Sequence, residues 1–212
     1  MGKSIHIAVI GGSGSGKTWL AQQLCSALGQ TARLSLDEFF RDLSHLTIEQ
    51  RSGVNFDDPD AIDWASARPV MERFLRGETA SVPVYDFTTH TRCREFHLFP
   101  AEPIVIWDGL WLLHDEWMRE RFACSIFVDC SAAERLTRRV TRDVRDRGRT
   151  ENSVRRQFQD HVQPMHERFV EPQRTLATHC VTSPLDGQQF EALLREVRAA
   201  ISNTRILPPT MS

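Results

Sequence analysis

The sequence has few of the features that target a chain to a membrane. Glycines stand near the N-terminus where a signal peptide needs an apolar core, and residue 6 is His6 rather than the Ser or Thr of a myristoylation site. No apolar run reaches the length of a transmembrane helix. We therefore expect a cytoplasmic protein without a membrane partner.

Cysteine is scarce and irregularly spaced. The five cysteines form an odd-numbered set without C-x-x-C spacing: Cys25, Cys93, Cys124, Cys130 and Cys180. This usage is typical of reduced thiols in a cytosolic chain. We expect these side chains to serve as packing residues.

An excess of charge of either sign is also missing. With 26 basic and 28 acidic residues the formal net charge is −2, so the chain has no general basic field. A nucleic-acid partner is therefore not expected, and positive charge has to act locally. A homo-oligomer is left as an open alternative.

Length and composition indicate one domain. A chain of 212 residues that is 41 % hydrophobic and 25 % charged can bury a full core. We expect a single domain over residues 1–202. Residues 203–212, which include Pro208 and Pro209 and few apolar groups, are predicted to form a disordered tail.

The most informative segment is the phosphate-loop pattern G-x-x-x-x-G-K-[ST] at residues 11–18. An apolar run precedes it at Ile5 to Ile10, and a helical pattern follows from Trp19 to Leu24. The glycines let the backbone fold with its N–H groups pointing inward, at the positive end of the next helix. The loop therefore predicts binding of a nucleoside triphosphate, which we take to be ATP.

Each part of the loop has an expected task. Lys17 is expected to reach the β- and γ-phosphates, and the Thr18 hydroxyl to ligate Mg²⁺. The predicted nucleotide-binding residues of the loop are Gly12, Ser13, Gly14, Ser15, Gly16, Lys17 and Thr18.

Apolar runs alternate with helical patterns along the rest of the chain. The runs lie at Ile5 to Ile10, Ala32 to Leu36, Pro103 to Trp107, Ser125 to Val128 and His179 to Thr182. This alternation predicts an α/β fold of the P-loop NTPase type, with a parallel sheet flanked by helices. Ligands of such sheets bind at the carboxyl ends of the strands.

Two carboxylates follow predicted strands. Asp37 is placed to accept the proton of an acceptor hydroxyl, and Asp108 to meet the metal directly or through water. Capping of a helix by Asp37 and a simple turn at Asp108 are the alternatives.

A segment that departs from this alternation of strand and helix patterns lies at about residues 81–99. Two alternating runs, Ser81 to Phe87 and Arg94 to Phe99, flank a polar turn. We predict a β-hairpin set beside the main sheet, which would carry the acceptor.

The motifs together resemble the uridine kinases (uridine–cytidine kinases) of the phosphoribulokinase/uridine kinase family, from the phosphate loop to about Arg174. Three segments carry this resemblance in the right order: DEFF at residues 37–40, NFDDPDA at residues 55–61 and PVYDFTTHTR at residues 83–92. The resemblance implies that the first supplies the catalytic base Asp37, the second binds ribose and the third holds the nucleobase.

The chemistry of these acceptor residues is consistent with the resemblance. Asp57 has two oxygens that could accept both vicinal hydroxyls of a ribose, and Phe87 shares a strand face with Tyr85. Tyr85 is the only tyrosine in a chain with twelve phenylalanines, so we expect its hydroxyl to form a hydrogen bond. The resemblance places His90 at the pyrimidine edge. An ordinary strand aromatic at Tyr85 and a helix start at residues 58–60 are the alternatives.

Arginines are concentrated before and after Gly148. Most of them, at positions 135–149, are expected to form a solvated helix face, because acidic residues are interleaved with them. Some should do more, because Arg135, Arg138/Arg139 and Arg142 share a helix face and Arg147 and Arg149 flank Gly148. This is the layout of a closing lid, at about residues 139–157, that brings guanidinium groups over the phosphates. The resemblance implies a catalytic role for Arg142, a nucleotide contact for Arg147 and substrate contacts for Arg139, Arg149 and Gln157.

Two residues depart from the family pattern. Phe40 replaces a tyrosine, which removes a hydroxyl near the acceptor, and Asp108 replaces a longer glutamate. The tryptophans Trp107, Trp111 and Trp117 are interpreted as core or interface residues.

The sequence thus predicts ATP-dependent phosphorylation of the 5′-hydroxyl of uridine or cytidine, with Mg²⁺ as cofactor. A kinase for nicotinamide riboside or a sugar phosphate is the alternative that Phe40 supports. A non-catalytic nucleotide-binding regulator is the third hypothesis, against which stands the absence of an N-K-x-D or T-K-x-D guanine motif.

Overall fold

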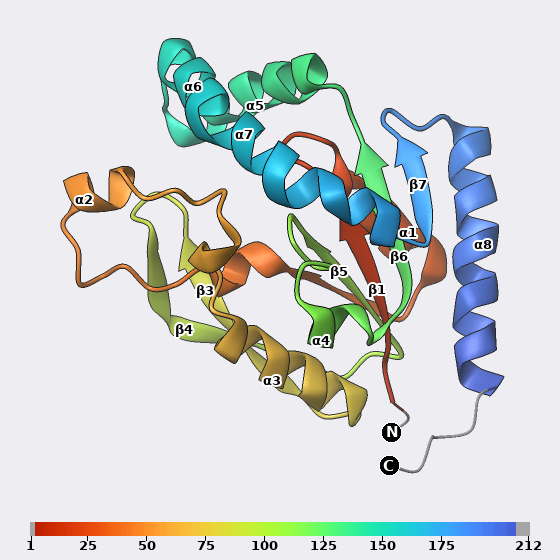
Figure 1. Cartoon of the computed structure of the whole chain (residues 1–212). Helices are drawn as coiled ribbons and strands as arrows, with labels where there is room; N and C mark the ends of the chain where they lie inside the picture. The colour runs from red at the N-terminus through yellow and green to blue at the C-terminus, as the bar shows by residue number, and fades with distance from the viewer. Residues whose placement is uncertain (1–2, 207–212) are drawn as a thin grey trace.

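The computed structural model describes residues 3–206 and is built around a parallel sheet with helices on both faces (Figure 1). Its strand order is β2-β5-β1-β6-β7, and every neighbouring pair is parallel. The strands are β1 (Ile5–Ile10), β2 (Thr31–Ser35), β5 (Ile104–Gly109), β6 (Phe122–Asp129) and β7 (His179–Thr182). The predicted α/β fold is confirmed.

The two central strands are buried at every position because helices and loops cover both faces of the sheet. The strands predicted at Ile5 to Ile10 and His179 to Thr182 have the predicted bounds. Strand β2 ends one residue earlier than expected, so Leu36 begins the short 3-10 helix η1 (Leu36–Phe39). Strand β5 continues to Gly109, so Asp108 lies inside the strand rather than after it.

One face of the sheet is covered by helices α1 (Lys17–Leu28) and α8 (Gly187–Ile206). Their buried side chains pack on alternate residues of β1, β5 and β6 in one apolar cluster: Leu20, Leu24, Leu193, Leu194 and Val197. The helices therefore hold the first residues of α1, where the phosphate loop ends, against the rigid centre of the sheet.

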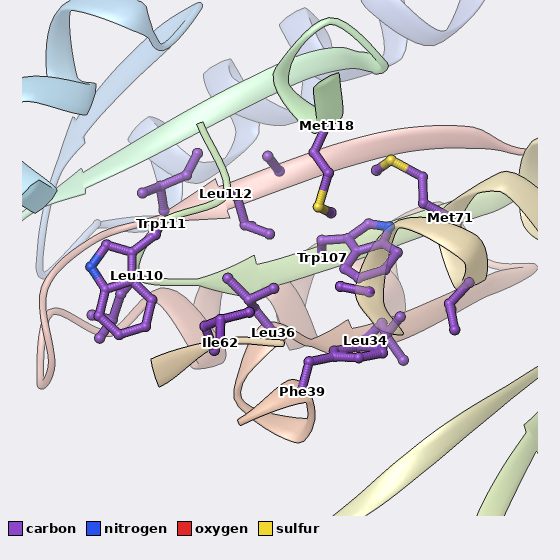
Figure 2. Close-up of a cluster of buried hydrophobic side chains, with 14 of the residues drawn as sticks. Leu34, Leu36, Phe39, Ile62, Met71, Trp107, Leu110, Trp111, Leu112 and Met118 are labelled. Carbon is purple, nitrogen blue, oxygen red and sulfur yellow. The ribbon is translucent and has the colours of Figure 1, made fainter. Parts of the chain in front are cut away.

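The other face carries a second apolar cluster, part of which Figure 2 shows. Helix α3 (Trp64–Leu75) contributes Met71, and the sheet and its following loop contribute Trp107 and Trp111, which are fully buried. These two tryptophans are core residues, as predicted. Trp117 is only partly buried, and the Arg121 guanidinium lies 3.7 Å from its ring centroid.

The predicted hairpin forms a separate two-stranded antiparallel sheet of β3 (Ala80–Asp86) and β4 (Thr91–Phe99). Arg92 fastens it to the domain, because its guanidinium donates to the carbonyl oxygens of Phe39 and Phe40 and to the Asp63 carboxylate. The hairpin is thereby fixed beside η1, the segment that carries Asp37.

The arginine-rich segment forms helix α5 (Ala132–Arg147), which ends at Gly148 with φ +62°. A long helical rod follows, in which two π-helical stretches interrupt the α-helix. It consists of α6 (Glu151–Gln157), η3 (Phe158–Val162), α7 (Gln163–Met165), η4 (His166–Val170) and the 3-10 helix η5 (Glu171–Leu176). Figure 1 shows α5 and α6 at the end of the sheet to which β1 points.

Three short elements complete the fold: α2 (Ile48–Ser52), the 3-10 helix η2 (Pro59–Ala61) and α4 (Glu116–Arg119). Helix α2 begins with a capping box in which the Thr47 hydroxyl accepts from the Gln50 amide. The predicted helix start at residues 58–60 is present, because Asp58 caps η2 and Pro59 opens it.

The predicted disordered tail is wrong at residues 203–206, which belong to α8. The apolar stripe of α8 continues to Ile201, which is 7 % exposed and packs on the sheet, so the helix extends past it. The rest of the predicted tail, 207–212, lies outside the described residues. None of the helices within residues 3–206 is long and apolar enough to cross a membrane.

The cysteines are free thiols in the described chain. Cys124 and Cys130 are buried, and Cys25 and Cys93 are partly buried, as expected of packing residues. Cys180 is exposed, so the expectation fails at that position.

Trp107 provides a test of the core. Its ring stacks on Phe39 at 6.0 Å, and its Nε1 donates to the buried Nδ1 of His6 over 2.9 Å. We expect Trp107→Ala to lower the free energy of unfolding by about 3–5 kcal/mol, measured by urea denaturation. The control Trp19→Ala, at a side chain 48 % exposed, should cost no more than about 0.5 kcal/mol. Equal losses in the two variants would contradict this description of the core.

Candidate active site

The phosphate loop connects β1 to α1 and has the backbone that its glycines allow. Gly14 and Gly16 have φ values of +82° and +97°, a region that other residues rarely adopt, and the Ser15 amide donates to the Gly12 carbonyl over 3.0 Å. Within the described chain, the N-terminus of α1 has no side-chain cap and no acidic residue in its first turn. Its amide groups are left for an external anion.

Helix α5 and the helical rod pack against the phosphate loop. A Cβ atom on Gly14 would lie 2.5 Å from the Arg135 carbonyl oxygen, and one on Gly12 would lie 2.7 Å from His166 Nδ1. Arg135 is 1 % exposed, and Arg135 Nη1 and His166 Nδ1 are buried without a hydrogen-bond partner among the described residues. The loop is therefore in contact with side chains from two distant segments.

Arg138 connects the phosphate loop to Ser183, the residue that directly follows strand β7. Its Nη1 donates to the Ser15 carbonyl over 3.1 Å and to the Ser183 hydroxyl over 2.9 Å. Arg135 and Arg138, which share the predicted helix face, thus pack against the loop, whereas Arg145 belongs to the solvated part, with a side chain that is 74 % exposed. Helical spacing places these arginines on a face but does not tell what packs against that face.

Lys17 begins α1 and is 9 % exposed. Burial lowers the pKa of its ammonium group, while the carboxylates of Asp37 and Asp108 raise it and the Arg142 guanidinium lowers it further. The lysine therefore lies among the two predicted carboxylates and one lid arginine, as the sequence suggested.

Asp37 lies in η1, directly after β2. The side chain of Ser35 caps this helix by accepting from the Asp37 amide over 3.3 Å, so the alternative capping role for Asp37 is excluded. Asp37 Oδ1 is inaccessible to solvent and has no hydrogen-bond partner in the described chain. Burial raises the pKa of the Asp37 carboxyl, and the nearby Lys17 opposes that rise.

Asp108 is 2 % exposed and both of its oxygens are engaged. The Thr18 hydroxyl donates to Oδ1 over 3.0 Å, and the Arg33 guanidinium on the neighbouring strand β2 donates to Oδ2 over 2.5 Å. The predicted metal-binding pair, Thr18 and Asp108, is therefore in direct contact. Hydroxyl and carboxylate oxygens are the ligands that Mg²⁺ prefers, so these residues fit that ion.

Asp57 lies on the other side of the phosphate loop and is 8 % exposed. It lines a small cavity with Gly12 and Ser13. Burial raises the pKa of its carboxyl, and the neighbouring cations Arg139 and Lys17 oppose that rise. A buried carboxylate therefore lies within the electrostatic reach of the loop lysine.

The hairpin and the segment before η2 form an aromatic cluster. Tyr85 packs against Phe40 at 5.4 Å and against Phe87 at 5.2 Å, and Phe56 stacks on His90 at 4.5 Å. The Tyr85 hydroxyl is buried and, among the described residues, has no hydrogen-bond partner, so the expected hydrogen bond is not formed within the chain. Burial raises the pKa of Tyr85 to about 12, so its hydroxyl stays protonated at neutral pH and can donate a hydrogen bond.

His90 occupies the turn of the hairpin with φ +55°. Its pKa is lowered by burial and by the guanidinium groups of Arg147 and Arg149, which favours the neutral imidazole. Arg147 lies over the ring of Phe87, with its Cζ 5.6 Å from the ring centroid. The arginine-rich segment therefore contacts the hairpin as well as the phosphate loop.

The other predicted lid residues form one network. Arg139 donates to the Ser13 hydroxyl over 2.7 Å and to Gln157 Oε1 over 2.9 Å, and Arg149 donates to the same amide oxygen. Gln157 on α6 thus accepts hydrogen bonds from Arg139 in α5 and from Arg149 just after α5, next to Ser13 of the loop. Sequence reasoning missed Arg33 and His166 as residues of this region.

A phosphate loop at the end of β1, an aspartate pair beside its lysine and an arginine-rich helical segment above them are features of P-loop kinases, which transfer a phosphoryl group to a hydroxyl. The Phosphoribulokinase / Uridine kinase family matches residues 6–186 of this chain. The chain belongs to this family and is a phosphotransferase with a hydroxyl group as acceptor. Kinases of this family use ATP.

Similar proteins agree with this assignment. The "Uridine kinase" of Deinococcus deserti is 39 % identical over 189 residues, which are 88 % of this chain and 90 % of that protein. The "Uridine kinase" of Halalkalibacterium halodurans is 36 % identical over 213 residues and covers 98 % of this chain and 100 % of its own.

Solved structures share the fold. A putative fructose transport system kinase from Silicibacter sp. TM1040 has a TM-score of 0.72 at 21 % identity, covering 85 % of this chain and 91 % of its own. The phosphoribulokinase of Rhodobacter spheroides has a TM-score of 0.64 at 15 % identity, covering 87 % of this chain and 72 % of its own. At these identities the likeness concerns the fold alone.

Gly14 tests the geometry of the loop. We expect Gly14→Ala to weaken ADP binding more than tenfold in calorimetric titration, because the new Cβ would lie 2.5 Å from backbone and φ is +82°. The control Gly29→Ala has φ +61° but open space around its Cβ. It should cost about 1–2 kcal/mol of stability and leave ADP binding unchanged. Full ADP affinity in Gly14→Ala would contradict the described contact with α5.

Proposed function

We propose that this chain transfers the γ-phosphoryl group of ATP to the 5′-hydroxyl of a pyrimidine ribonucleoside, giving UMP from uridine or CMP from cytidine. The observation that carries this proposal is the buried Asp57, which lines a cavity with Gly12 and Ser13 of the phosphate loop and directly follows Phe56, whose ring stacks on His90 in the aromatic cluster. The curated relatives that bear the name uridine kinase support the same substrate class.

The donor side consists of the phosphate loop, residues 12–18. Its free amide groups and the Lys17 ammonium would bind the β- and γ-phosphates, and Arg147 would contact the same nucleotide. Thr18 and Asp108 would hold the magnesium ion, since their oxygens are 3.0 Å apart and suit it chemically. When bound, magnesium supplies positive charge to the phosphate oxygens of ATP.

Asp37 acts as the base in this proposal. Its carboxylate would accept the proton of the 5′-hydroxyl while that oxygen forms a bond to the γ-phosphorus and the bond to the β-phosphate oxygen breaks, releasing ADP. The pKa of Asp37 is raised by burial, which makes its carboxylate a stronger base than an exposed one. The orphan Oδ1 is free to accept that proton.

The acceptor side would recognise both parts of a ribonucleoside. Asp57 would accept hydrogen bonds from the 2′- and 3′-hydroxyls, which disfavours a sugar that lacks one of them. The faces of Tyr85 and Phe87 suit a planar base, and the neutral His90 can exchange a hydrogen bond with its edge.

The lid arginines complete the cleft. Arg142 would neutralise charge on the transferring phosphoryl group, because it is among the charges that act on Lys17 and Asp37. Arg139, Arg149 and Gln157 form the network next to the loop and Asp57, where they would contact the acceptor.

Phe40 supports a second candidate, a kinase for nicotinamide riboside or a sugar phosphate. Its ring packs edge-on against Phe56 at 5.6 Å and Trp111 at 6.4 Å, so this side of the acceptor site presents carbon instead of a hydroxyl. The change removes a hydrogen-bonding group near the sugar, which bears on the choice of acceptor. The aromatic cluster on the hairpin favours the pyrimidine nucleoside.

An acceptor panel tests the proposal. ADP release is measured with ATP, Mg²⁺ and, in turn, uridine, cytidine, 2′-deoxyuridine, nicotinamide riboside and ribulose 5-phosphate. We expect uridine or cytidine to accelerate ADP release at least 100-fold over the hydrolysis of ATP alone, and the deoxynucleoside to react at least tenfold less efficiently. Acceleration by another acceptor and by neither pyrimidine nucleoside would refute the proposed substrate.

Asp37→Asn tests the base. We expect kcat to fall by about 10²–10⁴-fold with ADP affinity unchanged, since the amide keeps the shape and loses the basicity. In the unmodified enzyme the rate should decline as pH falls through the raised pKa of Asp37, and this acid limb should vanish in the variant. Glu72→Gln, at a carboxylate on α3 whose side chain is 47 % exposed, is the control and should keep full activity. Normal turnover in Asp37→Asn would remove this residue from its role.

A further inference from the structure

Asp143 on α5 is a fully buried carboxylate surrounded by arginines. Its Oδ1 accepts from Arg142 Nε over 2.8 Å and lies 3.6 Å from Arg147 Nη1. Its Oδ2 lies 3.5 Å from Arg139 Nε and 3.9 Å from Arg149 Nη1. One carboxylate is therefore shared by four guanidinium groups.

The helix and its C-cap explain how the four cations reach one residue. Arg139 and Arg147 lie four residues before and after Asp143, so all three share a face of α5. Gly148, with φ +62°, then reverses the chain, and the amides of Gly148 and Arg149 both donate to the Asp143 carbonyl oxygen. The backbone carbonyl of Asp143 thus stabilises the turn at Gly148, and its side chain attracts Arg149, which follows that turn.

One negative charge cannot balance four positive ones, so the cluster keeps an excess of positive charge. Burial lowers the pKa of Arg139 and of Arg147, and neighbouring arginines lower it further. Asp143 opposes this change at both arginines, together with Asp57 at Arg139 and Asp37 at Arg147. Asp143 Oδ2 has no hydrogen bond among the described residues, so it attracts its neighbours through charge alone. Without this carboxylate, nothing else in contact with all four guanidinium groups would oppose their repulsion.

We propose that Asp143 is the positioning residue of the lid: it does not touch substrate but gathers Arg139, Arg142, Arg147 and Arg149 before the phosphates arrive. The inference rests on the proposed function, in which these arginines face the phosphates and the nucleoside. Arg142 depends on it most, because its side chain is 38 % exposed and its hydrogen bond to Asp143 is the one that keeps it from turning to solvent. Preassembled cations spare the enzyme their reorganisation during phosphoryl transfer.

The same helix provides a matched control. Asp146 lies three residues further along α5 and pairs with Arg145 over 2.6 Å, but both side chains are exposed. Asp146→Asn removes the same charge from the same helix, but its ion pair is with Arg145, and it acts on Arg142 and Arg147 only through charge at longer range. Asp143→Asn keeps the volume of the buried side chain and removes only its charge.

The test is a double-mutant cycle on kcat with Asp143→Asn, Arg142→Ala and the combined variant, next to Asp146→Asn. We expect Asp143→Asn to lower kcat by about 10–100-fold and to raise the KM for nucleoside by a smaller factor, since only Arg139 and Arg149 of the four arginines would contact the acceptor. In the Arg142→Ala background the same substitution should lower kcat less than threefold. A full loss in that background, or a loss equal to that of Asp146→Asn, would overturn the inference.

A second measurement covers the case in which Asp143→Asn does not fold. If repulsion among the arginines is the cause, the additional substitution Arg147→Met should restore cooperative thermal unfolding. Failure to restore it would indicate a packing role and overturn the inference. The slow hydrolysis of ATP without acceptor gives an independent readout, because its response to Asp143→Asn does not depend on which nucleoside is the substrate. If the acceptor panel fails while this response persists, the proposed substrate fails and the inference about Asp143 stands.

Discussion

The close contact between the phosphate loop and helix α5 is the constraint on which the rest of the cleft depends. Gly14 approaches the backbone at Arg135 so closely that no side chain fits, and Arg138 binds the carbonyl side of the loop. The loop amides are thereby turned toward the open side of the cleft. The same helix carries the lid arginines, so the position of the loop and the position of the cations over it are set by a single packing interface.

Charge in this region is arranged in two layers. The inner layer pairs Lys17 with the carboxylates of Asp37 and Asp108 at the carboxyl ends of β2 and β5. The outer layer consists of the arginines around Asp143. The chain has only two lysines, Lys3 and Lys17, so nearly all cations of the cleft are arginines, whose planar groups suit phosphate oxygens. A triphosphate would enter between two layers that already hold each other in place.

Sequence reasoning predicted the sheet, the hairpin and the contact of Thr18 with Asp108, because apolar periodicity and the loop motif determine them locally. It could not separate Asp143 from Asp146, since both follow an arginine on the same helix and only packing tells that one is buried and the other exposed. It likewise missed His166 and the packing of Arg135 on the loop, because their partners are glycines more than a hundred residues away. Residues 203–206 are mostly polar and suggest a tail, but the helix extends through them because its apolar stripe continues to Ile201.

The hairpin of β3 and β4 shares no strand pairing with the five-stranded sheet in residues 3–206 and is attached through Arg92 and through the buried side chains of Ala80, Val82 and Tyr85. The exposed side chains of β4 can therefore change without altering the register of the central strands β1 and β5. In the proposed function the hairpin contacts the acceptor, whereas the phosphate loop binds the donor. Under that proposal, substitutions on the hairpin would change acceptor preference and leave the donor half of the site in place.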